Sequence, residues 1–200
     1  MPTPHERWDE VFLSGKDFAL INERFLDGTI LPKVRTIVDT STPHALDIGC
    51  GTGDFLAKLA SRGFLVDGID ASSVALDTGR ERLGGDARKL LCVDLDRPDY
   101  SQLASHYDLG SMKLVLAFVS EKDRVLDRVK EWITPKGVFL LITPIITDTM
   151  PVITPKAQAI SIPEEEAERL LTDHFQSWER IGKEDTHEGL VLATYMAFAE

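Results

Sequence analysis

Cysteine is scarce in this sequence, because the 200 residues include only Cys50 and Cys92. Two cysteines are too few for a disulfide framework, and their spacing is not that of a zinc site. The five histidines are also scattered, without the short spacings of metal ligands. We therefore expect two reduced thiols and no metal site.

The sequence also has no excess of positive charge and no long hydrophobic stretch. The 22 Lys and Arg residues are outnumbered by 33 Asp and Glu, which gives a formal net charge of −11. No basic run offers a surface for phosphate backbones or an anionic membrane. No stretch approaches the roughly 18 apolar residues of a membrane span, and residues 1–7 contain no hydrophobic signal segment. The sequence thus predicts no nucleic acid partner, no membrane partner and a cytoplasmic protein, either a monomer or a homodimer.

What the sequence does contain is an alternation of short apolar runs with helical patterns between residues 44 and 143. This alternation is typical of a parallel sheet with crossover helices. A turn near residues 186–189 predicts a final antiparallel hairpin. The length fits a single domain of residues 1–200. The expected strands are 44–49, 64–69, 89–94, 107–112, 137–143, 177–183 and 190–199.

Helices are expected before and within this alternation. Residues 5–39 carry apolar side chains at spacings that predict two or three short amphipathic helices. Ser120, with Asp123 three residues later, predicts a capping box at the start of a helix. This helix is expected to end near Pro135.

The strongest functional signal is ALDIGCGTGD, residues 45–54, in which an apolar strand runs into a turn with Gly49, Gly51 and Gly53 and then into a helix. Glycine lets the backbone turn tightly and approach a ligand, and a helix N-terminus favours a negative group. Asp70 follows the next strand, 21 residues after Gly49, where a carboxylate can accept hydrogen bonds from ribose hydroxyls. Together these features predict a nucleoside-binding crevice.

Two families of nucleoside-binding proteins use such a crevice, and the glycine spacing separates them. A dinucleotide-binding fold prefers G-x-G-x-x-G/A, but the third small position falls on Asp54. The pattern D-x-G-x-G-x-G from Asp47 to Gly53 instead resembles the first motif of the class I S-adenosylmethionine-dependent methyltransferases. The resemblance runs from about Trp8 to the terminal hairpin. It implies a Rossmann-like methyltransferase fold of the α/β class, with a seven-stranded, mostly parallel sheet, an antiparallel last strand and helices on both faces.

The resemblance also assigns residues to the cofactor, S-adenosyl-L-methionine. It implies that Asp47 and the backbone of residues 49–51 hold the methionine part and that Asp70 binds the ribose. The adenine is assigned to the ends of the second and third strands, and the sulfonium and the acceptor to the end of the fourth. The residues placed at the cofactor are Trp8, Asp47, Gly49, Cys50, Gly51, Gly53, Asp70, Ala71, Ser72, Asp94, Leu95, Met112 and Lys113.

Some of these assignments have alternatives. Residues 1–42 are expected to form an N-terminal helical lid segment, in which Trp8 and Phe12 either cover the cofactor or belong to the core. Asp94 has acidic neighbours in Asp96 and Asp99, so a surface acidic cluster competes with adenine binding.

The activity implied is transfer of a methyl group to a small-molecule acceptor by in-line displacement. The sequence lacks the (N/D)-P-P-(Y/F/W) signature of enzymes that methylate nucleic acid bases. No catalytic residue is identified, although Lys113, Glu121 and Asp148 are candidates for a general base. Three alternatives remain. One is a non-catalytic S-adenosylmethionine-binding regulatory protein, and another is a nicotinamide- or flavin-dependent oxidoreductase. The third is methylation of a protein acceptor, whereas the net charge disfavours RNA.

Overall fold

The strands of the chain form one sheet with the order β3-β2-β1-β4-β5-β8-β7, and a short strand, β6, pairs with β5 beyond this path. This is a computed structural model that describes residues 4–15, 22–97, 103, 106–147, 154–185 and 191–200. The strands are β1 (His44–Ile48), β2 (Leu65–Asp70), β3 (Ala87–Cys92), β4 (Tyr107–Lys113), β5 (Ile133–Ile146), β6 (Ile162–Pro163), β7 (Ser177–Asp185) and β8 (Val191–Phe198).

The pairing of these strands matches the predicted architecture. Strands β3, β2, β1, β4 and β5 are mutually parallel. The last strand, β8, lies antiparallel to both β5 and β7. The predicted α/β sheet and its antiparallel last strand are therefore confirmed. β6 was not expected, because two residues are too few to leave a strand pattern in the sequence.

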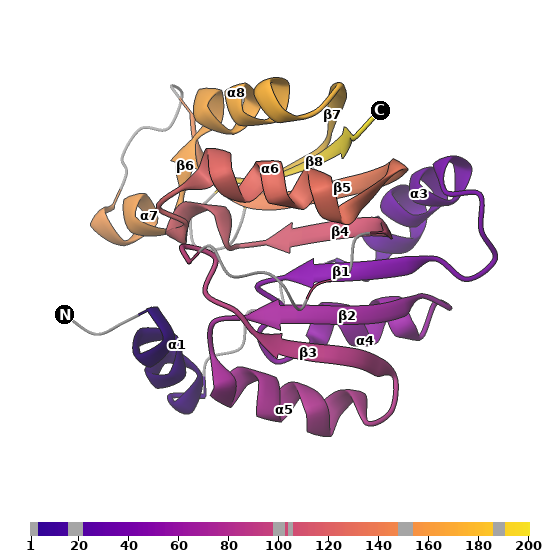
Figure 1. Cartoon of the computed structure of the whole chain (residues 1–200). Coiled ribbons are helices and arrows are strands. Elements are labelled where there is room, and N and C mark those ends of the chain that lie inside the picture. The colour runs from indigo at the N-terminus through magenta and orange to yellow at the C-terminus, as the bar shows by residue number, and fades with distance from the viewer. Residues whose placement is uncertain (1–3, 16–21, 98–102, 104–105, 148–153, 186–190) are drawn as a thin grey trace.

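Helices cover both faces of the sheet (Figure 1). One face carries η2 (Leu116–Phe118), α6 (Lys122–Trp132) and α8 (Glu164–His174), whose apolar side chains form one core cluster with the sheet. The other face carries η1 (Leu26–Ile30), α3 (Leu31–Ile37), α4 (Asp54–Ala60) and α5 (Ser73–Leu83), which form the second cluster. The remaining helices are α1 (Pro4–Leu13), α2 (Glu23–Phe25) and α7 (Pro155–Ile160).

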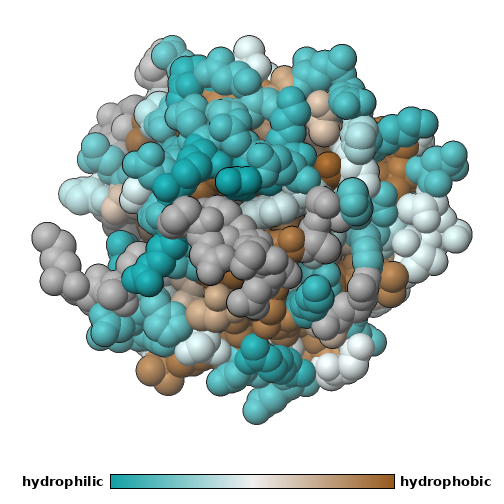
Figure 2. All heavy atoms as spheres, viewed as in Figure 1, coloured by the Kyte–Doolittle hydropathy of each residue, from teal (hydrophilic) through white to brown (hydrophobic). Residues whose placement is uncertain are grey.

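On the face of the molecule that Figure 2 shows, the hydropathy of the surface differs between the two halves of the sheet. Hydrophilic residues gather over α6 and α8, whereas hydrophobic residues are visible at the level of β2 and β3 (Figure 2). Leu91, Val93 and Leu95 of this region are only partly buried against the core. Among the described residues, no helix is both long and apolar enough to cross a membrane.

The start of α6 differs from the predicted capping box. The helix begins at Lys122, and Glu121, its N-cap residue, makes no side-chain capping bond. Instead, Asp96 from the segment after β3 accepts hydrogen bonds from the backbone N–H groups of Ser120 (2.9 Å) and Glu121 (3.3 Å). The helix ends at Trp132, earlier than the predicted end near Pro135, because the chain passes directly into β5.

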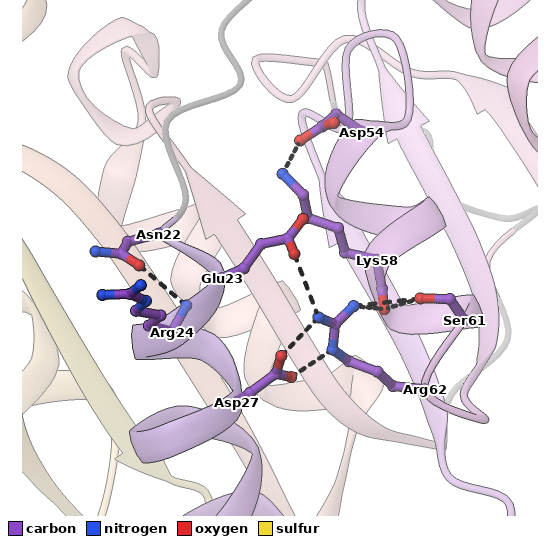
Figure 3. Close-up of polar contacts among 8 residues, drawn as sticks. All are labelled: Asn22, Glu23, Arg24, Asp27, Asp54, Lys58, Ser61 and Arg62. Carbon is purple, nitrogen blue, oxygen red and sulfur yellow. Dashed lines mark hydrogen bonds and ion pairs between the residues drawn. The ribbon is translucent and has the colours of Figure 1, made fainter.

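The N-terminal helices divide into two parts with different surroundings. From α2 to α3 the chain packs onto the sheet, and the ring of Phe25 lies so close to Gly182 that a Cβ there would be 2.7 Å from Cζ. A paired contact from Asp27 to the guanidinium of Arg62 ties this segment to the end of α4, with Glu23 also within 3.9 Å (Figure 3). The hydrogen bond from Arg62 lowers the pKa of Asp27. Among the described helices of the predicted lid segment, α1 alone lies elsewhere, beside α5 (Figure 1).

Candidate functional site

The glycine turn after β1 has the backbone conformation that its composition requires. Gly49, Gly51 and Gly53 all have positive φ, at 73°, 53° and 75°, a region that other residues enter only at a cost. A Cβ on Gly49 would also lie 2.1 Å from a methyl group of Val115. The N–H groups of Gly49 and Cys50 both donate to the carbonyl oxygen of Ile69. The turn is therefore fixed to the end of β2.

Asp70 ends β2 and faces this turn. Its Oδ2 accepts the N–H of Gly51 and its Oδ1 accepts the N–H of Ser72, both at 2.8 Å. The side chain is buried, and this burial raises the pKa of Asp70 although the hydrogen bonds act in the opposite direction. The structure thus brings together the glycine turn and the carboxylate that the sequence singled out.

Asp47 lies beneath the turn on β1 and is a second buried carboxylate. Only 1% of its surface is exposed, and its Oδ1 accepts the hydroxyl of Ser111 on β4 at 2.7 Å. Burial raises the pKa of Asp47 to about 7, while Ser111 and the charge of Lys113 act in the opposite direction. Sequence analysis did not identify Ser111, because a single serine within an apolar strand carries no signal of its partner.

Two other residues of this segment, Cys50 and Asp54, have contacts or burial that account for them within the fold. Cys50 is buried, and burial raises the pKa of its thiol well above the usual range, which disfavours the nucleophilic thiolate form. Asp54 begins α4 and pairs with Lys58 at 2.7 Å (Figure 3). A carboxylate at this helix N-terminus disfavours the pyrophosphate that a dinucleotide would place there.

Helix α1 lies across the end of the sheet that carries these residues. Trp8 packs edge-to-face on Phe118 of η2, with ring centroids 4.8 Å apart. The ring of Phe12 lies beside Gly51, 3.2 Å from the position of a Cβ. Ser72, which was assigned to the adenine, donates its hydroxyl to Asp9 of α1 at 2.6 Å. Ala71, assigned with it, contacts the ring of His5 through its carbonyl oxygen.

The residues assigned to the third and fourth strands lie at the same end of the sheet. Asp94 accepts the N–H of Asp96 at 3.0 Å and pairs with Arg97 at 3.2 Å, so its carboxylate is engaged within its own turn. Leu95 packs partly buried against the core. The side chain of Met112 is fully buried in the core cluster on the α6 face.

The structure does not single out a general base among the three candidates. Lys113 ends β4 and is close enough to Asp47 to influence its pKa. Glu121 is exposed at the start of α6, and Asp148 lies outside the described residues. Within the part of the chain that the structure describes, no group of three or more His, Cys, Asp or Glu side chains could hold a metal ion. The described part of the site therefore consists of two buried carboxylates, Asp47 and Asp70, and the adjoining glycine turn.

Known proteins resemble the chain in sequence and in fold. A family model described as a methyltransferase domain matches residues 46–139. The chain is 31% identical over 106 residues to the trans-aconitate 2-methyltransferase of Deinococcus radiodurans, which covers 51% of this chain and 39% of that protein. The chain spans only 30% and 39% of the length of the two curated relatives it matches.

Two solved structures share the fold over nearly the whole chain. The plantazolicin methyltransferase BpumL in complex with SAH has a TM-score of 0.69 at 15% identity, covering 98% of this chain and 90% of that one. The [4+2]-cyclase SpnF has a TM-score of 0.70 at 16% identity, with coverages of 98% and 97%. Identities this low show the fold alone. One of these proteins is a methyltransferase and the other a cyclase, so this fold supports more than one chemistry.

Proposed function

Because residues 46–139 form a methyltransferase domain of the class I, S-adenosylmethionine-dependent family, as the sequence pattern predicted, we propose that this chain transfers a methyl group from S-adenosylmethionine to a small-molecule acceptor. The observation that carries the proposal is the buried carboxylate of Asp70, which lies against the backbone of the glycine turn. Each carboxylate oxygen can accept two hydrogen bonds. Besides the backbone N–H groups that it binds, Asp70 therefore has acceptor capacity left for ribose hydroxyls.

The chemistry of the remaining side chains fits the same cofactor. Asp47 and the backbone of residues 49–51 would hold the methionine part, and Ala71 and Ser72 would lie beside the adenine. Asp94 and Leu95 would contact the adenine edge, although Asp94 shares its carboxylate with Arg97. The charged start of α4 at Asp54 argues against a nicotinamide dinucleotide in the same place.

The residues of this chain would promote methyl transfer mainly by positioning the two reactants and excluding water. When bound, S-adenosylmethionine supplies an activated methyl group for in-line displacement. Holding two reactants in the reacting geometry can lower a barrier by roughly 7–11 kcal/mol. Lys113, at the end of β4, and the aromatic pair Trp8 and Phe118 would border the acceptor. A general base is needed only for an acceptor that must lose a proton.

A small-molecule acceptor is supported by two observations. The net charge of −11 disfavours nucleic acid, and one relative is named for trans-aconitate, a small molecule. The proposal is tested by incubating the purified protein and S-adenosylmethionine with a panel of metabolites and measuring S-adenosylhomocysteine. Acceptor-dependent formation supports the transferase. Tight binding of the cofactor with no turnover across the panel would favour the regulatory protein instead.

Helix α1 is proposed as the lid of this site. Aromatic side chains from such a segment exclude water and attract a cationic sulfonium, by about 0.5–2 kcal/mol. We expect hydrogen exchange of residues 5–13 to slow when S-adenosylhomocysteine binds. The amides of α3, which lies at the opposite end of the molecule from α1 (Figure 1), serve as the control. Equal and strong protection of residues 5–13 with and without ligand would make α1 ordinary core rather than a lid.

A further inference from the structure

Two polar side chains anchor α1 to the turn between β2 and α5. Asp9 accepts three hydrogen bonds there, from the hydroxyl of Ser72 (2.6 Å), the N–H of Val74 (3.2 Å) and the hydroxyl of Ser73 (3.4 Å). One helical turn earlier, His5 contacts the carbonyl oxygen of Ala71 through Nδ1 and lies 3.6 Å from Asp9 through Nε2. The polar side of α1 thus meets one short segment, residues 71–74.

The same segment holds the carboxylate of Asp70. The backbone N–H of Ser72 donates to Asp70 Oδ1, while the side-chain hydroxyl of Ser72 donates to Asp9. The other oxygen of Asp70 accepts the N–H of Gly51. A continuous hydrogen-bonded path therefore runs from Asp9 through Ser72 and Asp70 to the glycine turn.

We propose that Asp9 is a positioning residue of the cofactor site, which couples the docking of α1 to the orientation of the ribose-binding carboxylate through Ser72. This inference rests on the proposed function, since it concerns the same site. It adds a residue that acts through others and does not itself touch the reacting atoms. It also explains how a helix before the first strand can affect binding at the end of β2.

The hydroxyl of Ser72 has a defined orientation only when Asp9 is present. A serine hydroxyl carries one hydrogen and two lone pairs. Its hydrogen goes to Asp9, and the oxygen accepts the N–H of Ala75, which makes Ser72 the N-cap of α5. Loss of Asp9 would free the hydrogen to rotate and remove the acceptor for the N–H of Val74. The first turn of α5 and the N–H that binds Asp70 would then be held less tightly.

The charge state of Asp9 suits this role. Burial raises the pKa of Asp9, but the hydrogen bonds from Ser72 and Val74 and the nearby His5 outweigh it and leave the pKa below its usual range. Asp9 is therefore ionised at neutral pH and accepts strong, charge-assisted hydrogen bonds. Glu10, its neighbour on α1, is exposed, which provides a charge-matched control on the same helix.

The proposal is tested by calorimetric titration of S-adenosylhomocysteine into the wild-type protein and into Asp9→Ala, Asp9→Asn and Glu10→Ala. We expect about tenfold weaker binding for Asp9→Ala, equivalent to about 1.4 kcal/mol, and less than a twofold change for Glu10→Ala. Asp9→Asn keeps an oxygen acceptor for Ser72 and is expected to retain part of the lost affinity. In the absence of ligand, the amides of residues 72–76 should exchange faster in Asp9→Ala than in the wild type.

A double-mutant cycle tests the path through Ser72. If Asp9 acts through this serine, Asp9→Ala should lose most of its effect in a Ser72→Ala background, because contacting residues are not additive. Full additivity, or wild-type affinity and wild-type exchange in Asp9→Ala, would overturn the inference while leaving the proposed function intact. Failure of the wild-type protein to bind S-adenosylhomocysteine at all would overturn the proposed function.

Discussion

Asp70→Ala is expected to weaken the binding of S-adenosylhomocysteine by about 2–4 kcal/mol, or roughly 30- to 700-fold. The carboxylate would accept two charge-assisted hydrogen bonds from the ribose, and each such bond contributes roughly 1.5–3 kcal/mol without being additive. Its burial beside the glycine turn, where bulk water does not compete, places the expected effect in this range. Isothermal titration calorimetry measures it directly.

The alanine variant also removes the acceptor for two backbone N–H groups, those of Gly51 and Ser72. Asp70→Asn therefore accompanies it, because an amide oxygen can still accept one of these bonds while the second strong acceptor is lost. Asp39→Ala removes a carboxylate from an exposed position before β1 and should bind normally. Unchanged affinity in a folded Asp70→Asn or Asp70→Ala protein would show that the ribose is held elsewhere.

Asp47→Asn is expected to make the protein more stable at neutral and alkaline pH while weakening cofactor binding. Burial raises the pKa of Asp47 from an ordinary value near 4 to about 7. The folded state therefore binds a proton more tightly than the unfolded state does. Between these two pKa values the stability of the wild-type protein falls as pH rises, by up to roughly 4 kcal/mol. Asparagine keeps the shape of the side chain and has no such dependence.

The measurement is the free energy of unfolding in urea at several pH values from 4.5 to 8. The advantage of Asp47→Asn over the wild type should grow with pH, and Asp39→Asn, at an exposed position, should show no such trend. Ser111→Ala should have the opposite effect at high pH, because it removes the hydroxyl that donates to the ionised carboxylate. A pH-independent difference between Asp47→Asn and the wild type would mean that Asp47 is not held with a raised pKa.

The regular part of the fold was predictable because its signals are local. Apolar runs bounded by turn residues placed seven strands close to their observed limits, although β5 begins at Ile133 and so extends well before the predicted residue 137. The glycine turn and Asp70 were predictable for the same reason. Three positive-φ glycines, at 49, 51 and 53, and a strand-end carboxylate each have a recognisable sequence pattern.

The contacts that complete the site could not be predicted, because they join residues far apart in the chain. Asp9 meets Ser72 across 63 positions, and Asp96 meets Ser120 across 24. The capping-box pattern at Ser120 was a clear local signal, yet Asp96, from the segment after β3, instead accepts the N–H groups of Ser120 and Glu121 just before α6. The hydrogen-bond partner of a short polar side chain such as Ser111 lies on the neighbouring strand, so the local sequence does not identify it.

The alternatives to a transferase differ from it either in turnover or in the ligand that the site would bind. A regulatory protein would bind S-adenosylmethionine without turnover, and a nicotinamide-dependent enzyme would bind a dinucleotide. The carboxylate of Asp54 at the start of α4 and its pairing with Lys58 argue against the second. The existence of a [4+2]-cyclase with this fold shows why the acceptor and the reaction need their own experiment.

The central claim, that this site holds S-adenosylmethionine, is tested most directly by calorimetric titration of the purified wild-type protein with S-adenosylhomocysteine and, separately, with NAD. We predict saturable binding of S-adenosylhomocysteine at one site. At a ligand concentration 100 times the dissociation constant, this binding should stabilise the protein against unfolding by about 2.7 kcal/mol. Binding of NAD with no binding of S-adenosylhomocysteine would contradict the claim.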